Sequence, residues 1–146
     1  MNWKFTEPLK SEKLISEYEE KIGYRFQEDF RECVMENNGG YPEKKFFYSQ
    51  KDNRRRKRVF NYLFSFNKND TGSIWGYNDW RGKFGDWFRY TNGEIENYVV
   101  FAGDTFGNFI GFKRKTNEIV FIDHEQMQAE KIADSFTELL NSMKSK

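Results

Sequence analysis

Short apolar runs separated by polar turns dominate the second half of the chain. Tyr98–Phe101 and Ile119–Ile122 are rich in β-branched and aromatic residues, which favour a pleated strand, and Phe109–Arg114 lies between them. The turns at 103–108 and 115–118 are short and rich in Gly, Asn and other polar residues. Because a parallel return needs a long crossover, this pattern predicts an antiparallel meander.

Nearer the two ends, apolar residues recur at helical spacing. Helices are predicted over Glu12–Ile22 and Asp29–Asn37, joined by a short turn that begins at Gly23. A third, amphipathic helix is predicted over Ala129–Met143. Its apolar stripe comprises Ile132, Phe136, Leu139, Leu140 and Met143. Helices segregated from an antiparallel sheet indicate an α+β architecture, here expected as one domain over residues 1–146.

The middle of the chain is less regular. Lys44–Ser49 predicts a strand, and Gln50–Arg58 is interpreted as a charged connector. Val59–Phe66 alternates with its aromatic residues on one face, which predicts a half-buried strand. Ile74–Tyr90 has aromatic residues at roughly helical spacing, but glycines interrupt it. A helix and irregular turns therefore both stay open for that segment.

Composition indicates a folded protein with an aromatic core. Aromatic residues make up 19% of the chain and charged residues 32%, although the mean hydropathy is −0.95. Disordered chains are poor in aromatic residues, whereas Tyr and Trp bury large areas despite low hydropathy scores. The net charge of +1 gives no global field for nucleic acid or an anionic membrane, so neither is expected as a direct partner.

Cys33 is the only cysteine and His124 the only histidine. These counts exclude an internal disulfide and a cysteine zinc cluster, and no metal or other cofactor is expected. Cys33 lies on the apolar stripe of the second predicted helix, which favours a core residue over a nucleophile paired with His124. The single cysteine and the charged N-terminus, without an apolar signal-peptide core or a membrane span, indicate the cytoplasm.

Asp123, His124 and Glu125 end the last strand of the predicted meander. With Asp104 they could bind a metal or perform acid–base chemistry, as in a hydrolase. Neighbouring residues of a strand point to opposite faces, however, so these side chains cannot converge while the strand continues. The favoured interpretation is a strand end whose Asp or Glu caps the approaching helix. The turn at 103–108 lacks a phosphate-loop pattern and precedes a strand, so a hairpin turn is expected there.

Two segments are candidates for partner binding. Residues 51–58, KDNRRRKR, are strongly basic and could contact nucleic acid or any acidic partner. No aromatic residue interleaves this run to stack bases, which favours a solvated connector. The tryptophans that follow are expected mainly in the core, and one left outside it would be a binding anchor. The candidate partner-binding residues are Arg54, Arg55, Arg56, Arg58, Trp75 and Trp80.

Four separated stretches resemble the SMI1/KNR4, or SUKH, superfamily in the expected order. They are ISEYEEKIGYRFQEDFRECVMENNGGYP, FAGDTFGNFIGF, EIVFIDHE and IADSFTELLNSM. The residues that carry the resemblance, with an expected structural role, are Gly23, Asn38, Gly39, Gly40, Pro42, Gly107, Asn108, Asp123, His124, Glu125 and Phe136. The chain departs from the family at Phe26-Gln27, where Leu-Pro is common, and the basic run and the Trp-rich segment have no counterpart.

The resemblance implies a twisted antiparallel sheet with an N-terminal helical hairpin and a C-terminal helix, no catalysis and no cofactor. It implies that small bacterial members act as immunity proteins, which bind and neutralise secreted toxins, often nucleases. Larger fungal members regulate cell-wall synthesis and signalling. A chain of 146 residues resembles the first group more closely. An immunity protein is thus the leading hypothesis, a scaffold or regulator the alternative, and a hydrolase using Asp123, His124 and Glu125 the third.

Overall fold

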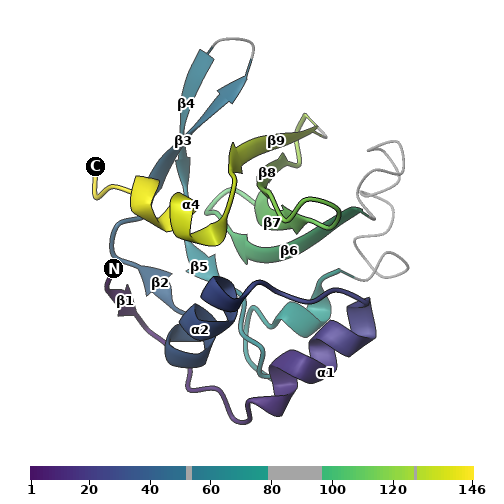
Figure 1. The fold of residues 1–146 in the computed structure, drawn as a ribbon. Coiled ribbons are helices and arrows are strands. Elements are labelled where there is room, and N and C mark those ends of the chain that lie inside the picture. The colour runs from purple at the N-terminus through teal and green to yellow at the C-terminus, as the bar shows by residue number, and fades with distance from the viewer. Residues whose placement is uncertain (52–53, 79–96, 127) are drawn as a thin grey trace.

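A five-stranded antiparallel sheet lies at the centre of the molecule, in the order β5-β6-β7-β8-β9 (Figure 1). The computed structural model describes residues 1–51, 54–78, 97–126 and 128–146. The strands are β5 (Tyr62–Leu63), β6 (Tyr98–Gly103), β7 (Phe109–Lys113), β8 (Ile119–Asp123) and β9 (Gln128–Ala133). Strands β6, β7 and β8 are the predicted meander, which is confirmed.

The helices of the described residues pack beside this sheet and share its core. They are α1 (Lys13–Ile22), α2 (Glu28–Asn37) and α4 (Phe136–Ser142). Helix α1 ends at Gly23, whose φ of +66° lies in the left-handed region that glycine tolerates. The ring centroid of Phe30 in α2 lies 4.9 Å from that of Phe101 in β6 and 5.2 Å from that of Phe136 in α4. The predicted α+β class is therefore confirmed.

Strand β6 is covered on both faces, and all of its residues are buried. Its neighbour β5 is only two residues long, so it cannot pair the whole edge of β6. The Asn78 side chain replaces the missing strand: it donates to the Val100 carbonyl at 3.0 Å and accepts from the Val100 N–H at 2.8 Å. The buried backbone at this edge is thus satisfied by a side chain.

The prediction of one helix over Ala129–Met143 was wrong. Residues 128–133 form strand β9, which pairs antiparallel with β8, and the helix begins only at Phe136. Ser135 is the N-cap of α4, because its hydroxyl accepts a hydrogen bond from the Glu138 N–H. The expectation that Asp123 or Glu125 caps this helix is therefore wrong too. Pairing with β8 overrode the helical spacing of the apolar residues.

The interpretation of Gln50–Arg58 as a connector was also wrong. Strands β3 (Phe46–Lys51) and β4 (Arg54–Val59) pair antiparallel from Phe46↔Val59 to Lys51↔Arg54. Together they form a two-stranded ribbon that projects away from the central sheet in Figure 1. We call Phe46–Val59 the basic ribbon. A strand whose side chains are largely solvated needs no apolar alternation, so its sequence resembles a loop.

The base of the basic ribbon is tied to the rest of the molecule. The backbone of Phe46 exchanges hydrogen bonds with Lys144, at 2.9 and 2.8 Å. Phe47 points to the other face and is buried, with its ring centroid 6.2 Å from that of Phe121 in β8. One face of the ribbon thus packs on the sheet, whereas the other is turned outward.

The remaining segments differ in part from the sequence pattern. The prediction of one half-buried strand over Val59–Phe66 was wrong, because Val59 ends β4 and only Tyr62–Leu63 form strand β5. Both faces of the segment are buried at Leu63, Phe64, Ser65 and Phe66. Ile74–Gly76 is a single 3₁₀ turn, and residues 79–90 of the predicted helical or irregular segment lie outside the described residues. Near the N-terminus, β1 (Trp3–Lys4) pairs with β2 (Tyr41–Pro42).

Candidate functional site

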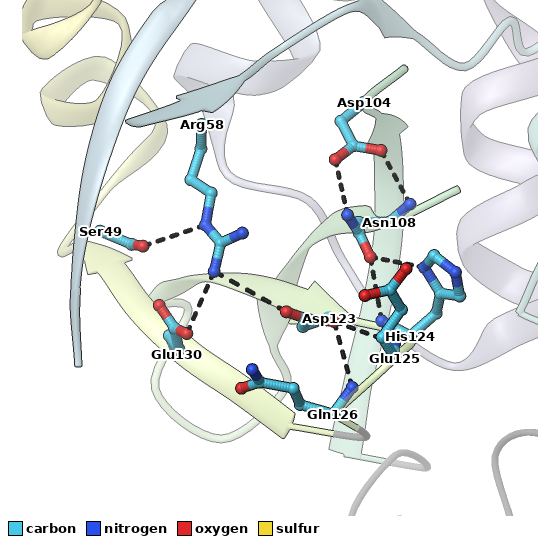
Figure 2. Close-up of polar contacts among 9 residues, drawn as sticks. All are labelled: Ser49, Arg58, Asp104, Asn108, Asp123, His124, Glu125, Gln126 and Glu130. Carbon is cyan, nitrogen blue, oxygen red and sulfur yellow. Dashed lines mark hydrogen bonds and ion pairs between the residues drawn. The ribbon is translucent and has the colours of Figure 1, made fainter. Parts of the chain in front are cut away.

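The side chains at the end of β8 hold turns and do not converge on a common point. The Asp123 carboxylate accepts hydrogen bonds from the N–H groups of Glu125 and Gln126, at 2.9 and 3.2 Å. The His124 ring is turned toward Asn108, and Asp123 toward Arg58 (Figure 2). The contacts of Asp123 and His124 thus run to different partners, and no group of metal-ligating side chains is found within the described residues.

Asn108 joins this strand end to the turn between β6 and β7. Its Oδ1 accepts the His124 N–H at 3.0 Å and lies 2.6 Å from His124 Nδ1, which must therefore carry the proton. Its Nδ2 donates to Asp104 Oδ2 at 2.7 Å, and Asp104 Oδ1 accepts the Asn108 and Phe106 N–H groups. At Gly107, which has a φ of +84°, a Cβ would lie 3.5 Å from the His124 ring. This polar cluster connects two adjacent turns.

The N-terminal residues of the family resemblance also make internal contacts. Asn38 is buried, and its amide donates to the Glu7 carbonyl and to Ser65 Oγ while it accepts the Phe66 N–H at 2.8 Å. A Cβ on Gly40 would lie 2.8 Å from the Asn37 carbonyl, so no side chain fits there. Asn38 therefore connects three segments that are distant in sequence.

Cys33 is half-buried and packs against the hydrophobic core. Burial raises the pKa of the Cys33 thiol to about 11, so the thiol stays protonated near neutral pH and is a poor nucleophile. Its carbonyl accepts a hydrogen bond from Asn37 within α2. This placement agrees with the expectation of a core residue.

The outer face of the basic ribbon carries alternating aromatic and cationic side chains. Tyr48 lies opposite Lys57, and the Arg55 guanidinium lies 3.7 Å from the Tyr48 ring centroid. Lys57 Nζ lies 4.2 Å from the Phe46 ring centroid. These are cation–π distances between cross-strand neighbours. The sequence run contains no aromatic residue, but the paired strand supplies two, so the reason given against base stacking was wrong.

The cations from Arg54 to Lys57, on both faces of strand β4, have no internal charge partner within the described residues. Arg54, Arg55 and Lys57 are exposed, and Arg56 is half-buried. Among the residues that the structure describes, no carboxylate is paired with any of these cations. We call Phe46, Tyr48, Arg55 and Lys57 the outer face of the ribbon, whereas Arg54 is exposed on the opposite face, at the end of the ribbon. The outer face combines positive charge with aromatic area, the two properties that interface anchors share.

Arg58, by contrast, is directed into the molecule (Figure 2). It donates to Ser49 Oγ at 3.2 Å and to Glu130 Oε1 at 3.4 Å, and it lies 3.8 Å from Asp123 Oδ2. Its guanidinium also covers the Phe121 ring at 4.3 Å from the centroid. Its side chain is 15% exposed. Arg58 therefore holds the ribbon to β8 and β9 rather than presenting its charge outward.

Trp75 also makes internal contacts. Its indole Nε1 donates to the Phe66 carbonyl at 2.8 Å, and its ring packs edge-on against Tyr18 with centroids 5.0 Å apart. Lys68 lies over the half-buried ring. Trp80, the second tryptophan named from the sequence, lies outside the described residues. The exposed candidates for partner binding are thus the arginines at the end of the ribbon.

Phe46 and Tyr48 are the ribbon residues that the sequence pattern did not identify. Their spacing of two, directly before the basic run, was the available signal, because same-face residues of a strand alternate. The register of the hairpin determines which cations lie beside them. That register could not be derived while Gln50–Arg58 was interpreted as a connector.

The fold and this surface define an α+β domain that displays a two-stranded basic ribbon. The model of the SUKH_6 family, described as SMI1-KNR4 cell-wall, matches residues 12–140. The chain therefore belongs to the SMI1-KNR4 family, as the resemblance implied, and this family is generally non-catalytic. A search of curated proteins finds no match. Within the described residues, none of the helices combines the length and apolar character that a bilayer crossing requires.

Proposed function

We propose that this protein is a non-catalytic immunity protein, which binds and neutralises a cognate toxin domain in the cytoplasm. Family membership supports the protein-binding class. The observation that carries the proposal is the outer face of the ribbon, where Arg55 and Lys57 lie beside aromatic rings and have no carboxylate partner among the described residues. Such a surface complements an acidic patch on a partner.

An acidic protein fits this surface better than nucleic acid does. The Arg55 guanidinium covers one face of Tyr48 at 3.7 Å, so that face is closed to a stacked base. The consecutive cations Arg54–Arg58 lie on one narrow two-stranded ribbon, which is a smaller basic footprint than the patches or stripes of nucleic-acid binders. Arg and Tyr together are the residues most enriched at protein interfaces.

The proposed mechanism is occlusion by the projecting ribbon. A nuclease that uses metal ions holds them with carboxylates, so its active site is an acidic concave surface. A narrow basic projection can enter such a site, where its cations pair with the carboxylates and its bulk excludes the substrate. Trp80 is retained as a proposed contact, whereas Arg58 and Trp75 are assigned to internal packing.

Co-expression with candidate toxin domains tests the proposal. We expect one cognate toxin to be neutralised by the wild-type protein, and protection to be lost when Arg54→Glu, Arg55→Glu and Lys57→Glu are combined. The matched control reverses the exposed Lys10, Lys13 and Lys115 to Glu, which changes the net charge equally and should keep protection. Equal loss in both triple variants would contradict a role for the ribbon.

Direct binding measurements separate the partner classes. Purified protein should bind the toxin domain, with an association rate that falls steeply with salt, and should show no comparable affinity for single-stranded DNA at physiological salt. Binding to DNA at equal strength, or failure to bind or rescue against every neighbouring toxin gene, would overturn the proposal.

The alternative is a scaffold or regulator of cell-wall synthesis or signalling. The cell-wall term in the description of the matching family favours this second candidate. It predicts that host proteins, rather than a toxin, are retained when the tagged protein is isolated from cells. If the ribbon triple variant no longer retains these host proteins, the outer face of the ribbon would be assigned to the scaffold or regulator function.

A further inference from the structure

A second surface, which shares no residue with the basic ribbon, combines aromatic rings with carboxylates. Residues near β1, β2, β5 and the 69–72 loop line an open groove of about 760 Å³. Phe5, Tyr41 and Tyr62 supply its aromatic rings, and Glu7 and Asp70 its carboxylates. Among the described residues no Lys, Arg or His lines it. The groove therefore has the opposite charge to the ribbon.

The three rings are arranged as a continuous aromatic wall. Phe5 meets Tyr41 edge-on, with centroids 5.8 Å apart and an interplanar angle of 87°. Tyr41 in turn stacks on Tyr62, with centroids 5.4 Å apart and an angle of 27°. Gly72 follows at the other side, where a Cβ would lie 2.8 Å from the Tyr62 ring. The absence of a side chain at Gly72 keeps the loop close to the wall.

Phe5 has an unfavourable backbone conformation, and packing of its side chain in the core does not compensate for it. Its φ of +55° lies in the left-handed region, which is costly for a bulky residue, and its side chain is 78% exposed. Strained residues with exposed apolar side chains are concentrated at binding sites, because the strain there serves a contact made with a ligand. Phe5 is therefore the clearest indication that something docks here.

We propose that this groove binds a short peptide segment of another protein through an arginine or lysine side chain. Aromatic faces and carboxylates both attract a cation, and here they line one groove that has no Lys, Arg or His among its described lining residues. A single cationic side chain would not fill about 760 Å³, whereas a few peptide residues would. The proposal does not depend on the immunity function and concerns a different surface.

Titration with defined peptides, followed by ¹H–¹⁵N NMR, tests the proposal. The probe is a capped peptide with one arginine flanked by glycine and serine, and its twins carry citrulline or glutamate in place of arginine. We expect the amides of Gly39, Thr71 and Gly72 to shift saturably with the arginine peptide, with a dissociation constant of about 1 mM or lower. The citrulline peptide should bind about three- to five-fold more weakly, and the glutamate peptide not measurably.

Variants connect the binding to the named residues. Phe5→Ala and Glu7→Gln should each weaken the arginine peptide about three- to five-fold. Phe106→Ala, which removes another exposed phenylalanine, should leave the affinity unchanged. Phe5→Gly removes the same ring but accommodates the positive φ, so we expect an unchanged or higher Tm together with the weakened binding. That pair of results separates lost binding from lost folding.

Three results would overturn the proposal. The first is the absence of saturable shifts with the arginine peptide at about ten times the expected dissociation constant. The second is equal affinity for the arginine and citrulline peptides, because a cation would then not be recognised. The third is tighter binding of a neutral oligosaccharide, which also stacks on aromatic rings and would be the preferred occupant.

Discussion

Asn108 shows how one amide side chain can connect two turns. It accepts from both the backbone and the ring of His124 and donates to Asp104, and it is 7% exposed. A carboxylate at position 108 could accept from His124 but could not donate to Asp104, and it would add a second negative charge beside Asp104. The neutral amide of Asn108 therefore connects the turn after β6 to the end of β8.

Replacement of Asn108 tests this structural role. Asn108→Ala removes hydrogen-bond partners of the buried Asp104 carboxylate and of the His124 N–H. We therefore expect the free energy of unfolding to fall by about 2–3 kcal/mol. Thr105→Ala, at an exposed position in the same turn, should change it by less than about 0.5 kcal/mol. Urea denaturation measures both. An equal effect of the two substitutions would contradict the assigned role of Asn108.

The raised pKa of the Cys33 thiol leads us to expect a lower free energy of unfolding in alkaline solution. Burial raises its pKa from 9.0 to about 11, so the folded state binds the thiol proton more tightly than the unfolded chain does. The associated stability is present below pH 9 and is lost as the pH rises toward 11. Between pH 8 and 10 this loss should reach about 1 kcal/mol.

The Cys33→Ala variant isolates this effect. Its baseline stability is lower, because a half-buried side chain is shortened, but its decline with pH should be shallower. Burial also raises the pKa of Tyr24 and Tyr62, so a residual alkaline slope remains in the variant. Urea unfolding at several pH values measures the slopes. Identical slopes for the variant and the wild type would assign the whole effect to other groups.

Among the secondary-structure elements, the basic ribbon depends most on one side chain. Arg58 spans from β4 to Glu130 in β9 and Asp123 in β8. Glu130 is 7% exposed, and its Oε2 finds no hydrogen-bond partner among the described residues. Its negative charge therefore relies on Arg58, because a buried charge without a partner is strongly destabilising.

Arg58→Met should loosen the ribbon. We expect unfolding free energy to fall by about 2–3 kcal/mol and amide exchange in β3 and β4 to accelerate, since Met keeps the packing stem but leaves Glu130 uncompensated. Arg54→Met, in an exposed position of the same strand, should change stability by less than about 0.5 kcal/mol. In the double variant with Glu130→Met, part of the loss should be recovered. A double variant that is less stable than Arg58→Met would refute the uncompensated charge as the cause.

The elements that the sequence predicted correctly are those built from local contacts. The turns between β6, β7 and β8 are short, so the meander follows from the pattern of apolar runs. Ile132 lies in register with Phe136 on a helical stripe, which concealed strand β9. The Ser135 cap, three residues before Glu138, was the local signal that the helix starts later.

The surfaces were harder to predict than the fold. The charge of the ribbon is visible in the sequence, but its register with Phe46 and Tyr48 is not. The segment Gln50–Arg58, misassigned as a connector, had to be recognised as the partner of the strand predicted over Lys44–Ser49. The groove depends on Phe5, Tyr41 and Tyr62, which come together only through the β1–β2 pairing and a long-range stack. Nothing in the sequence around Phe5 predicts a positive φ there.

On the scale of the whole molecule, a net charge of +1 conceals two surfaces of opposite sign. The basic ribbon projects beyond the central sheet (Figure 1). The acidic aromatic groove is lined by residues near β1, β2 and β5. Global charge therefore predicts neither partner, because recognition depends on local fields that act over about one Debye length. The two proposals together assign a partner of different chemistry to each surface.

This separation predicts that the two surfaces act independently. The ribbon triple variant, Arg54→Glu with Arg55→Glu and Lys57→Glu, should lose toxin binding and keep the affinity of the groove for the arginine peptide. Phe5→Ala should do the opposite.

In the combined variant, each binding free energy should equal that of the relevant single-surface variant within about 0.5 kcal/mol, because distant sites without shared contacts are additive. Calorimetry with each ligand measures all four proteins. Loss of toxin binding in Phe5→Ala alone would mean that one partner occupies both surfaces, with an arginine or lysine of the toxin in the groove while its acidic patch receives the ribbon.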